Sequence, residues 1–231
     1  KRMFRMITLH IANKNYSSWS LRPWVLLHEL GVPFEERMHP FAPGSNWEAF
    51  RAFSPNGRVP CLQDGDTVVW DSLAIMEYLA ERHPAWPQDS AARTWARCAT
   101  AEMHSGFSAL RQQCSMSCGL RIRLHEIGPQ LAADVARIDE LWREGLRRFG
   151  GPFLAGDRFT AVDAFYAPVV FRVQTYGLSL SPEAMAWVER MLALPTMRRW
   201  YDEALAETWR DTPHDVESAE VGTITADLRA R

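Results

Sequence analysis

An Asp-Gly pair at residues 64–65 is the feature that most restricts how the first third of the chain folds. The pair lies between two short apolar runs, Val59 to Gln63 and Thr67 to Trp70. Tight turns between paired strands need residues that tolerate positive φ, so Asp-Gly between apolar runs is a strong hairpin signal. Residues 59–70 are therefore expected to form two antiparallel strands.

The segments around this hairpin alternate between strand and helix patterns. Pro23 is tolerated only in the first turn of a helix, so the first helix is expected to begin near Ser20. Taken in order, the expected elements are strands at residues 7–12 and 34–38 and helices at residues 20–30, 47–53 and 72–79. The order β-α-β-α-β-β-α predicts a small mixed sheet with helices on its faces.

Beyond residues 83–87, which contain two prolines, the sequence shows helical periodicity and no strand signals. Residues 131–149 repeat apolar side chains every three or four positions, and residues 162–173 are apolar nearly all round, which predicts a helix buried inside a bundle. We therefore expect a mixed-sheet domain over residues 1–84 and an all-helical domain over residues 90–231. The polar tail from Pro213 is expected to be loosely held.

The composition excludes several classes of function. The chain has 26 basic and 28 acidic side chains and a formal net charge of -2, so it offers no broad positive field to nucleic acid or to an anionic membrane. No apolar run reaches the roughly 20 residues of a membrane helix, and residues 1–11 lack a secretory pattern. The four cysteines have no disulfide-framework spacing. These observations predict a cytoplasmic protein.

A metal site is an alternative use of the cysteines. Cys114 and Cys118 are spaced to share a helical face, and His104 and His125 are nearby in the sequence. A tetrahedral site needs four ligands in a definite register, so we expect small buried or half-buried thiols and no metal. The ten tryptophans are expected to fill gaps between helices.

Ser17 and Ser18 lie just ahead of the first predicted helix. The unpaired N–H groups and the macrodipole at a helix amino end favour an anion there, and a hydroxyl beside them can donate to a thiolate or an oxyanion. The alternative is that these serines only cap the helix, as serine does at many helix starts.

Two further pairs also lie next to element starts. Pro60 has no N–H for a sheet ladder and belongs at a strand start, with its peptide bond either cis or trans. A cis bond would leave the backbone of Val59 free to pair with an extended peptide. Asp71 and Ser72 precede another helix, where the N–H groups can hold a carboxylate while Asp71 binds an ammonium group. A plain capping role for Ser72 is the alternative.

In this order and spacing, the motifs resemble those of the cytosolic glutathione transferases. The segment from Ser17 to Arg22 is similar to the serine motif of the zeta and related serine classes, and Val59-Pro60 to their cis-proline element. The segments 71–75 and 160–163 resemble the acid-Ser-x-Ala-Ile box and the capping box of helix 6. The resemblance extends to about residue 205. It implies a thioredoxin-like α/β domain, an all-α second domain, a homodimer, and glutathione as co-substrate.

The resemblance also implies roles for particular residues. Ser17 would donate its hydroxyl to the glutathione sulfur, with Ser18 as the substitute. The residues implied to bind glutathione are Arg58, Val59, Pro60, Asp71 and Ser72. A second-substrate pocket is expected from one continuous helix that carries Met103, His104, Phe107 and Leu110, with Phe165 and Arg172 opposite. A stripe of Met and aromatic side chains is also typical of plain core.

Two departures put a zeta-type isomerase in doubt. Trp19 stands where the zeta pattern has cysteine, and Thr175 where its helix 6 has arginine, with Arg172 one turn earlier. We therefore expect conjugation of glutathione to soft, hydrophobic electrophiles, with peroxidase or isomerase side activity left open. The alternatives are a non-catalytic binding or assembly module, maleylacetoacetate isomerisation, and disulfide reduction, which prefers cysteine at the activating position.

Overall fold

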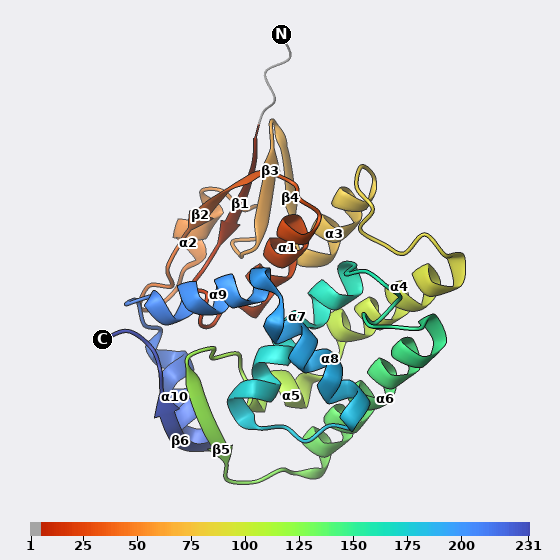
Figure 1. Ribbon diagram of the computed structural model, residues 1–231. Helices are drawn as coiled ribbons and strands as arrows, with labels where there is room; N and C mark the ends of the chain where they lie inside the picture. Colours follow the sequence, from red (N-terminus) through yellow and green to blue (C-terminus); the bar gives the residue numbers. More distant parts are fainter. Residues whose placement is uncertain (1–5) are drawn as a thin grey trace.

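A four-stranded mixed sheet forms the first part of the computed structural model, which describes residues 6–231 (Figure 1). The strands β1 (Ile7–Ile11), β2 (Phe34–Met38), β3 (Cys61–Asp64) and β4 (Thr67–Trp70) lie in the order β2-β1-β3-β4. β2 runs parallel to β1, and the other neighbours are antiparallel. The predicted hairpin is confirmed: Asp64 pairs with Thr67, and Gly65 takes a φ of 62° that the turn requires.

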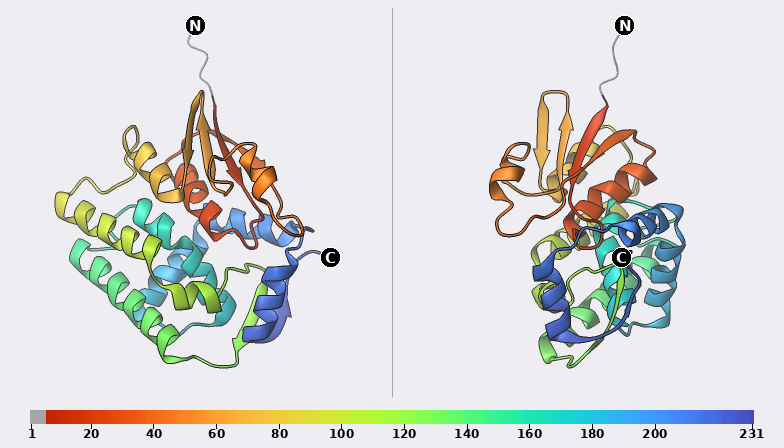
Figure 2. Two further views of the ribbon diagram at one scale, coloured as in Figure 1. Left: turned by 180° about the vertical axis from the view of Figure 1, so that it is seen from behind. Right: turned by 90° about the vertical axis from the view of Figure 1, so that its left-hand side faces the viewer.

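Three helices cover the sheet. α1 (Ser18–Glu29) and α3 (Ser72–Ala80) contact each other on one side, and α2 (Trp47–Arg51) lies on the other (Figure 2). α1 begins two residues earlier than the expected start near Ser20, which places Pro23 in its second turn. A tight turn sets this start, because the Ser17 N–H donates to the Asn13 carbonyl at 2.8 Å.

Seven helices make up most of the remaining chain. They are α4 (Ser90–Ser105), α5 (Ser108–Gln113), α6 (Pro129–Phe149), α7 (Ala161–Tyr176), α8 (Pro182–Ala193), α9 (Pro195–Ala206) and α10 (Thr212–Val221). α7 is buried along nearly its whole length, as its all-round apolar sequence predicts, and it packs against α1, α4 and α8. In the capping box at its start, Asp163 accepts the Thr160 N–H at 3.0 Å. α7 therefore joins the sheet to the helices.

Several tryptophan side chains fill the space between helices, as predicted, but Trp47, Trp70 and Trp209 are exposed. Trp142 and Trp187 are fully enclosed, with ring centroids 4.4 Å apart, and Trp24 and Trp200 meet edge to face at 5.1 Å. The domain division expected between residues 84 and 90 falls in the segment that joins α3 to α4.

The second half contains two strands that the sequence did not predict. β5 (Leu120–Leu124) and β6 (Gly222–Asp227) form an antiparallel pair beside α10 (Figure 1). The expectation of a loosely held tail after Pro213 is wrong, because this tail forms α10 and β6. Arg229 then forms ion pairs with Asp215 and Asp227. Polar contacts therefore hold this polar tail in place.

Within residues 6–231, no helix combines the length and the apolarity that crossing a membrane requires. Residues 1–5, which begin the first predicted domain and the segment read for a secretory pattern, lie outside the described residues.

Candidate functional site

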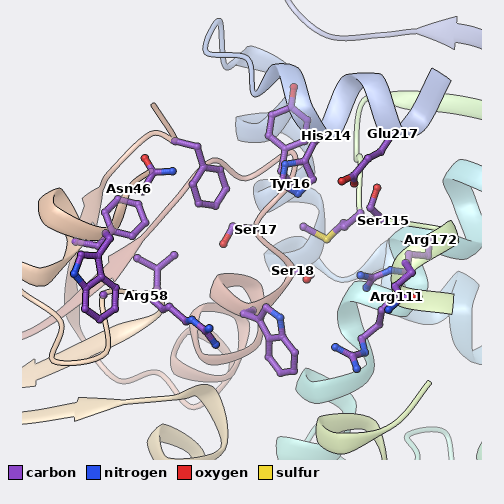
Figure 3. Close-up of a pocket in the computed structure, with 18 of the residues that line it drawn as sticks. Tyr16, Ser17, Ser18, Asn46, Arg58, Arg111, Ser115, Arg172, His214 and Glu217 are labelled. Carbon is purple, nitrogen blue, oxygen red and sulfur yellow. The ribbon is translucent and has the colours of Figure 1, made fainter. Parts of the chain in front are cut away.

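A cavity of about 800 Å³ lies where the sheet meets the helices (Figure 3). Its walls come from the loop between β1 and α1, the segment before β3, α5 and the loop after it, α7, and α10. A smaller cavity of about 320 Å³ shares four lining residues with the first, namely Trp19, Arg58, Val59 and Arg111. The two cavities together border all of the residues predicted to bind glutathione.

Ser17 and Ser18 both line the larger cavity, at the amino end of α1 (Figure 3). Ser17 occupies the N-cap position, but its side chain makes no capping hydrogen bond. Its Oγ lies 2.6 Å from the Oγ of Ser20, which accepts the Ala12 N–H at 3.3 Å. Ser17 is 6% exposed, and Ser18 is half-buried. The hydroxyl of Ser17 is thus directed by Ser20 and not by the helix backbone.

Tyr16 borders the same cavity, but its hydroxyl is engaged elsewhere. The Tyr16 hydroxyl donates to Asp215 Oδ1 at 3.0 Å and accepts a hydrogen bond from Arg229 at 3.0 Å. Burial raises the pKa of Tyr16 to about 12. Figure 3 shows this hydroxyl directed away from Ser17 and Ser18. The phenol therefore anchors the carboxy-terminal segment.

The Val59-Pro60 peptide bond is cis, and Pro60 immediately precedes β3. Val59 lines both cavities. Its N–H and C=O form no hydrogen bond with any of residues 6–231. An extended peptide in the cavity would therefore find both groups free, as the sequence analysis anticipated for a cis bond. Arg58 is exposed and lines both cavities.

Asp71 and Ser72 lie on the smaller cavity at the start of α3. Asp71, not Ser72, is the capping residue, and its side chain accepts the Leu73 N–H at 3.1 Å. Asp71 has a φ of 74°, a left-handed conformation that costs about 1–3 kcal/mol in a non-glycine residue and is concentrated at binding sites. Ser72 Oγ is buried and has no partner in the described chain. A ligand oxygen in this cavity would meet an unused donor.

The residues predicted for a second-substrate pocket do not line one common cavity in the structure. Met103 is fully buried in the core, and Phe107 is 8% exposed; neither lines either cavity. The expected continuous helix ends at Ser105, and Phe107 has a φ of 56° in the turn to α5. Leu110 and Phe165 also belong to the core. These four residues are therefore part of the core, which was the alternative to a pocket wall.

His104 and Arg172 reach the two cavities separately. His104 lines the smaller one, with its Nε2 3.7 Å from Asp71 Oδ1. Arg172 lines the larger one, and its Nε donates to the Cys114 carbonyl at 2.6 Å. Trp19 borders both cavities, and its ring meets the His104 ring edge on at 5.5 Å. Trp19, at the position where the zeta pattern has cysteine, thus forms a wall of both cavities.

The cysteines do not form the helical pair that their spacing suggested. Cys114 and Cys118 lie in the loop between α5 and β5, and both are buried. Burial raises the pKa of Cys114 to about 12 and raises that of Cys118 further. In the described part of the chain, no three His, Cys, Asp or Glu side chains come together as metal ligands.

Two family models match the chain over the parts that build these cavities. Residues 16–82 match the glutathione S-transferase N-terminal domain, and residues 92–203 match the glutathione S-transferase C-terminal domain. The chain belongs to the glutathione S-transferase family. The zeta-like serine subgroup stays a prediction, because the match extends to the family alone.

Proteins that are similar to this chain have descriptions that agree with the family. The chain is 26% identical to glutathione S-transferase GstB of Escherichia coli K12 over 219 residues, 86% of this chain and 92% of that protein. It is 26% identical to a probable maleylacetoacetate isomerase of Caenorhabditis elegans over 174 residues, 72% and 79% of the two chains. A theta class glutathione S-transferase from Xanthomonas axonopodis pv. citri, solved with glutathione bound, has a TM-score of 0.63 at 27% identity and covers 84% of this chain and 96% of its own.

Several cavity residues of this transferase were missed by sequence reasoning. They are Phe41, Asn46, Trp47, Arg111, Ser115, His214, Glu217 and Glu220. Arg111 directly follows Leu110, the last residue of the stripe expected as a pocket wall, and the break at Gly106 would have signalled that a new helix carries it. His214 and Glu217 belong to the tail that was expected to be loose, and no local pattern connects them to the first helix.

Proposed function

We propose that this protein conjugates the thiolate of glutathione to an electrophile, with the Ser17 hydroxyl donating a hydrogen bond to the sulfur. The observation that carries the proposal is the pair of hydroxyls at the start of α1. Ser20 Oγ accepts the Ala12 N–H, so its own proton is available to Ser17 Oγ at 2.6 Å. The proton of Ser17 is then free to point into the cavity, where the sulfur would lie.

The free energy needed to ionise the thiol is within the stabilisation that Ser17 and the amino end of α1 can supply. A free thiol has a pKa of about 8.5, so only a few per cent is ionised at neutral pH. Lowering that pKa to about 6.5 needs about 2.7 kcal/mol of differential stabilisation. A hydrogen bond to a charged group contributes about 1.5–3 kcal/mol, and a helix amino end contributes up to about 2 kcal/mol. Ser17 and α1 together suffice.

The rest of the tripeptide is held in part by groups that have no partner among residues 6–231. The cysteinyl unit pairs with the backbone of Val59, and the γ-glutamyl carboxylate accepts from Ser72 Oγ, which is buried and unpaired in the described structure. Asp71 takes the ammonium group, and Arg58 adds a weaker polar contact. The smaller cavity, which all four residues line, is the place for this end of glutathione.

Two alternatives remain less favoured. Similarity to a probable maleylacetoacetate isomerase supports isomerisation of maleylacetoacetate. However, Trp19 and Thr175 depart from the zeta pattern. A non-catalytic module would have no use for a serine hydroxyl freed from capping. The homodimer and the cytoplasmic location stay predictions.

The direct test is steady-state kinetics of Ser17→Ala with glutathione and a soft electrophile, beside Ser18→Ala as the matched control. We expect Ser17→Ala to lower kcat about tenfold to a hundredfold, the value of one charged hydrogen bond, with the KM for glutathione little changed. Ser18→Ala should lower kcat by less than about threefold. A large loss in Ser18→Ala alone would move the donor role to Ser18.

A further inference from the structure

Three arginine side chains lie near one another at the helical side of the molecule's larger cavity, and two of them line it. Arg111 on α5 and Arg172 on α7 line the cavity, and Figure 3 shows both guanidinium groups near Ser18. Arg22 on α1 lies against Trp19, with its guanidinium carbon 4.1 Å from a ring centroid. None of the three takes part in the ion pairs found among residues 6–231.

The hydrogen-bonding capacity of these side chains is only partly used. Arg172 is 3% exposed, and its Nη1 has no partner in the part of the chain described. Arg22 is fully buried, donates through Nε to the Phe165 carbonyl at 2.8 Å, and leaves both Nη atoms unpaired. A guanidinium carries five N–H donors, and a buried donor without an acceptor is costly. The cluster therefore holds unused donors, and Arg172, which carries one of them, lines the cavity.

The charges of the cluster oppose one another. Burial, with a smaller contribution from Arg111, lowers the pKa of Arg172 to about 10, so Arg172 is still cationic at neutral pH. Burial also lowers the pKa of Arg22; Arg172 and Arg111 add to that effect, and Asp71 acts in the opposite direction. The acidic residues on the cavity wall, Glu217 and Glu220, are exposed on α10 and pair with none of these arginines. An anion placed among the arginines would relieve their repulsion.

Resting on the proposed function, we infer that the second substrate carries an anionic group, a carboxylate or a similar oxyanion, which Arg172 and Arg111 bind. The γ-glutamyl carboxylate of glutathione has another partner in the proposal, because Ser72 lies on the smaller cavity. The bound anion directs the reactive carbon toward the sulfur beside Ser17. This substrate class differs from the hydrophobic electrophile that the family resemblance implies.

A chloronitrobenzoate illustrates the reaction. The glutathione sulfur forms a bond to the ring carbon that bears chlorine, the carbon–chlorine bond breaks, and chloride leaves with the bonding electrons. The thiol proton passes to solvent before the attack. The carboxylate on the ring takes no part in the bond changes and serves only as the group that the arginines hold.

The test compares 4-chloro-3-nitrobenzoate with 4-chloro-3-nitrobenzamide, two compounds of similar shape and different charge. Each kcat/KM is divided by the uncatalysed rate with glutathione, which removes the difference in intrinsic reactivity. We expect the native enzyme to prefer the benzoate about tenfold or more. Arg172→Met and Arg111→Met should each lower that preference about tenfold, and Arg172→Lys should keep part of it. Arg198→Met removes an equal charge from an exposed position on α9 and should leave the preference unchanged.

Each outcome separates this inference from the proposed function. Turnover of the benzamide with no preference for the benzoate would overturn the anionic substrate and leave conjugation standing. No turnover of either compound would contradict both. A preference that survives in Arg172→Met and Arg111→Met, with a raised KM for glutathione, would assign the arginines to glutathione and overturn the inference.

Discussion

Ser17 Oγ lies 2.6 Å from Ser20 Oγ, three residues further along the chain at the start of α1. The Ala12 N–H at the end of β1 donates to Ser20, so a chain of donors runs from the sheet through two hydroxyls toward the cavity. Hydrogen bonds in such a chain polarise one another, which strengthens the last donor. In the proposed function the two serines therefore act as a unit, and Ser17 donates to the sulfur.

Ser20→Ala is expected to lower kcat about tenfold, although Ser20 is fully buried and lines neither cavity. The loss arises because Ser17 no longer receives a proton from Ser20. The double variant Ser17→Ala/Ser20→Ala should be no slower than Ser17→Ala, since residues in one network are not additive. The test is to measure kcat of the native protein, the two single variants and the double variant. If the loss of kcat in the double variant equals the product of the two single losses, Ser20 acts independently of Ser17.

Ser72→Ala should weaken glutathione binding and stabilise the free protein at the same time. Removing the hydroxyl lowers affinity about tenfold, because the glutathione carboxylate loses a donor. It also removes a buried hydroxyl that lacks a partner in the described chain, so the free energy of unfolding should rise by about 1 kcal/mol. Calorimetric titration and denaturant unfolding measure the two effects. Ser105→Ala, an exposed serine on α4, is the control, and weaker binding with lower stability would contradict the assignment.

Tyr16→Phe should leave turnover within about threefold of the native value and loosen the carboxy-terminal segment. The hydroxyl that this change removes bonds Asp215 and Arg229, which connect α10 and the end of the chain to the first loop. Faster proteolysis within residues 212–231 is the expected sign. A hundredfold loss of kcat with an unchanged cleavage pattern would instead make Tyr16 the thiol's hydrogen-bond donor.

Stability should depend on pH through Asp163, because burial raises the pKa of this carboxyl to about 6, against an ordinary value of 3.8. The folded state then binds the proton more tightly than the unfolded state. The contribution of Asp163 to stability is therefore largest below pH 4 and is lost as the pH rises through 6, by about 1.4 kcal/mol per pH unit within that window.

Comparing native protein with Asp163→Asn by denaturant unfolding at several pH values isolates this effect. The difference in unfolding free energy should shift in favour of the native protein as the pH falls from 7 to 4, and should be flat above pH 7. A difference independent of pH would mean that the hydrogen bonds from Leu154, Thr160 and Trp187 keep the carboxylate ionised throughout.

Features set by neighbouring residues were predicted well from the sequence. The Asp64-Gly65 turn, the all-round apolar α7 and the succession of strands and helices in the first part of the chain follow from local pattern, and the structure has them. Ser17 and Ser18 were also placed at the start of the first helix, because a strand-to-helix junction is itself a local feature. Only the start of α1 was placed too late, since a backbone turn from Asn13 outweighs the preference of Pro23 for a first turn.

Features that need distant partners were missed. β5 pairs with β6 about a hundred residues later, so neither strand has a hairpin signal of its own. Arg229 holds α10 against Tyr16, and sequence pattern cannot connect residues so far apart. Phe107 was assigned to a pocket wall because the turn at Gly106, which directs its side chain into the core, looked like continuous helix.

The central claim is tested most directly by titrating the thiol of bound glutathione through its ultraviolet thiolate absorbance, in the native protein and in Ser17→Ala. We predict a bound-thiol pKa about two pH units below that of free glutathione in the native protein, and a pKa about one to two units higher than this in Ser17→Ala, which loses one hydrogen bond to the sulfur. Equal pKa values in the two proteins, with glutathione bound to both, would contradict activation by Ser17.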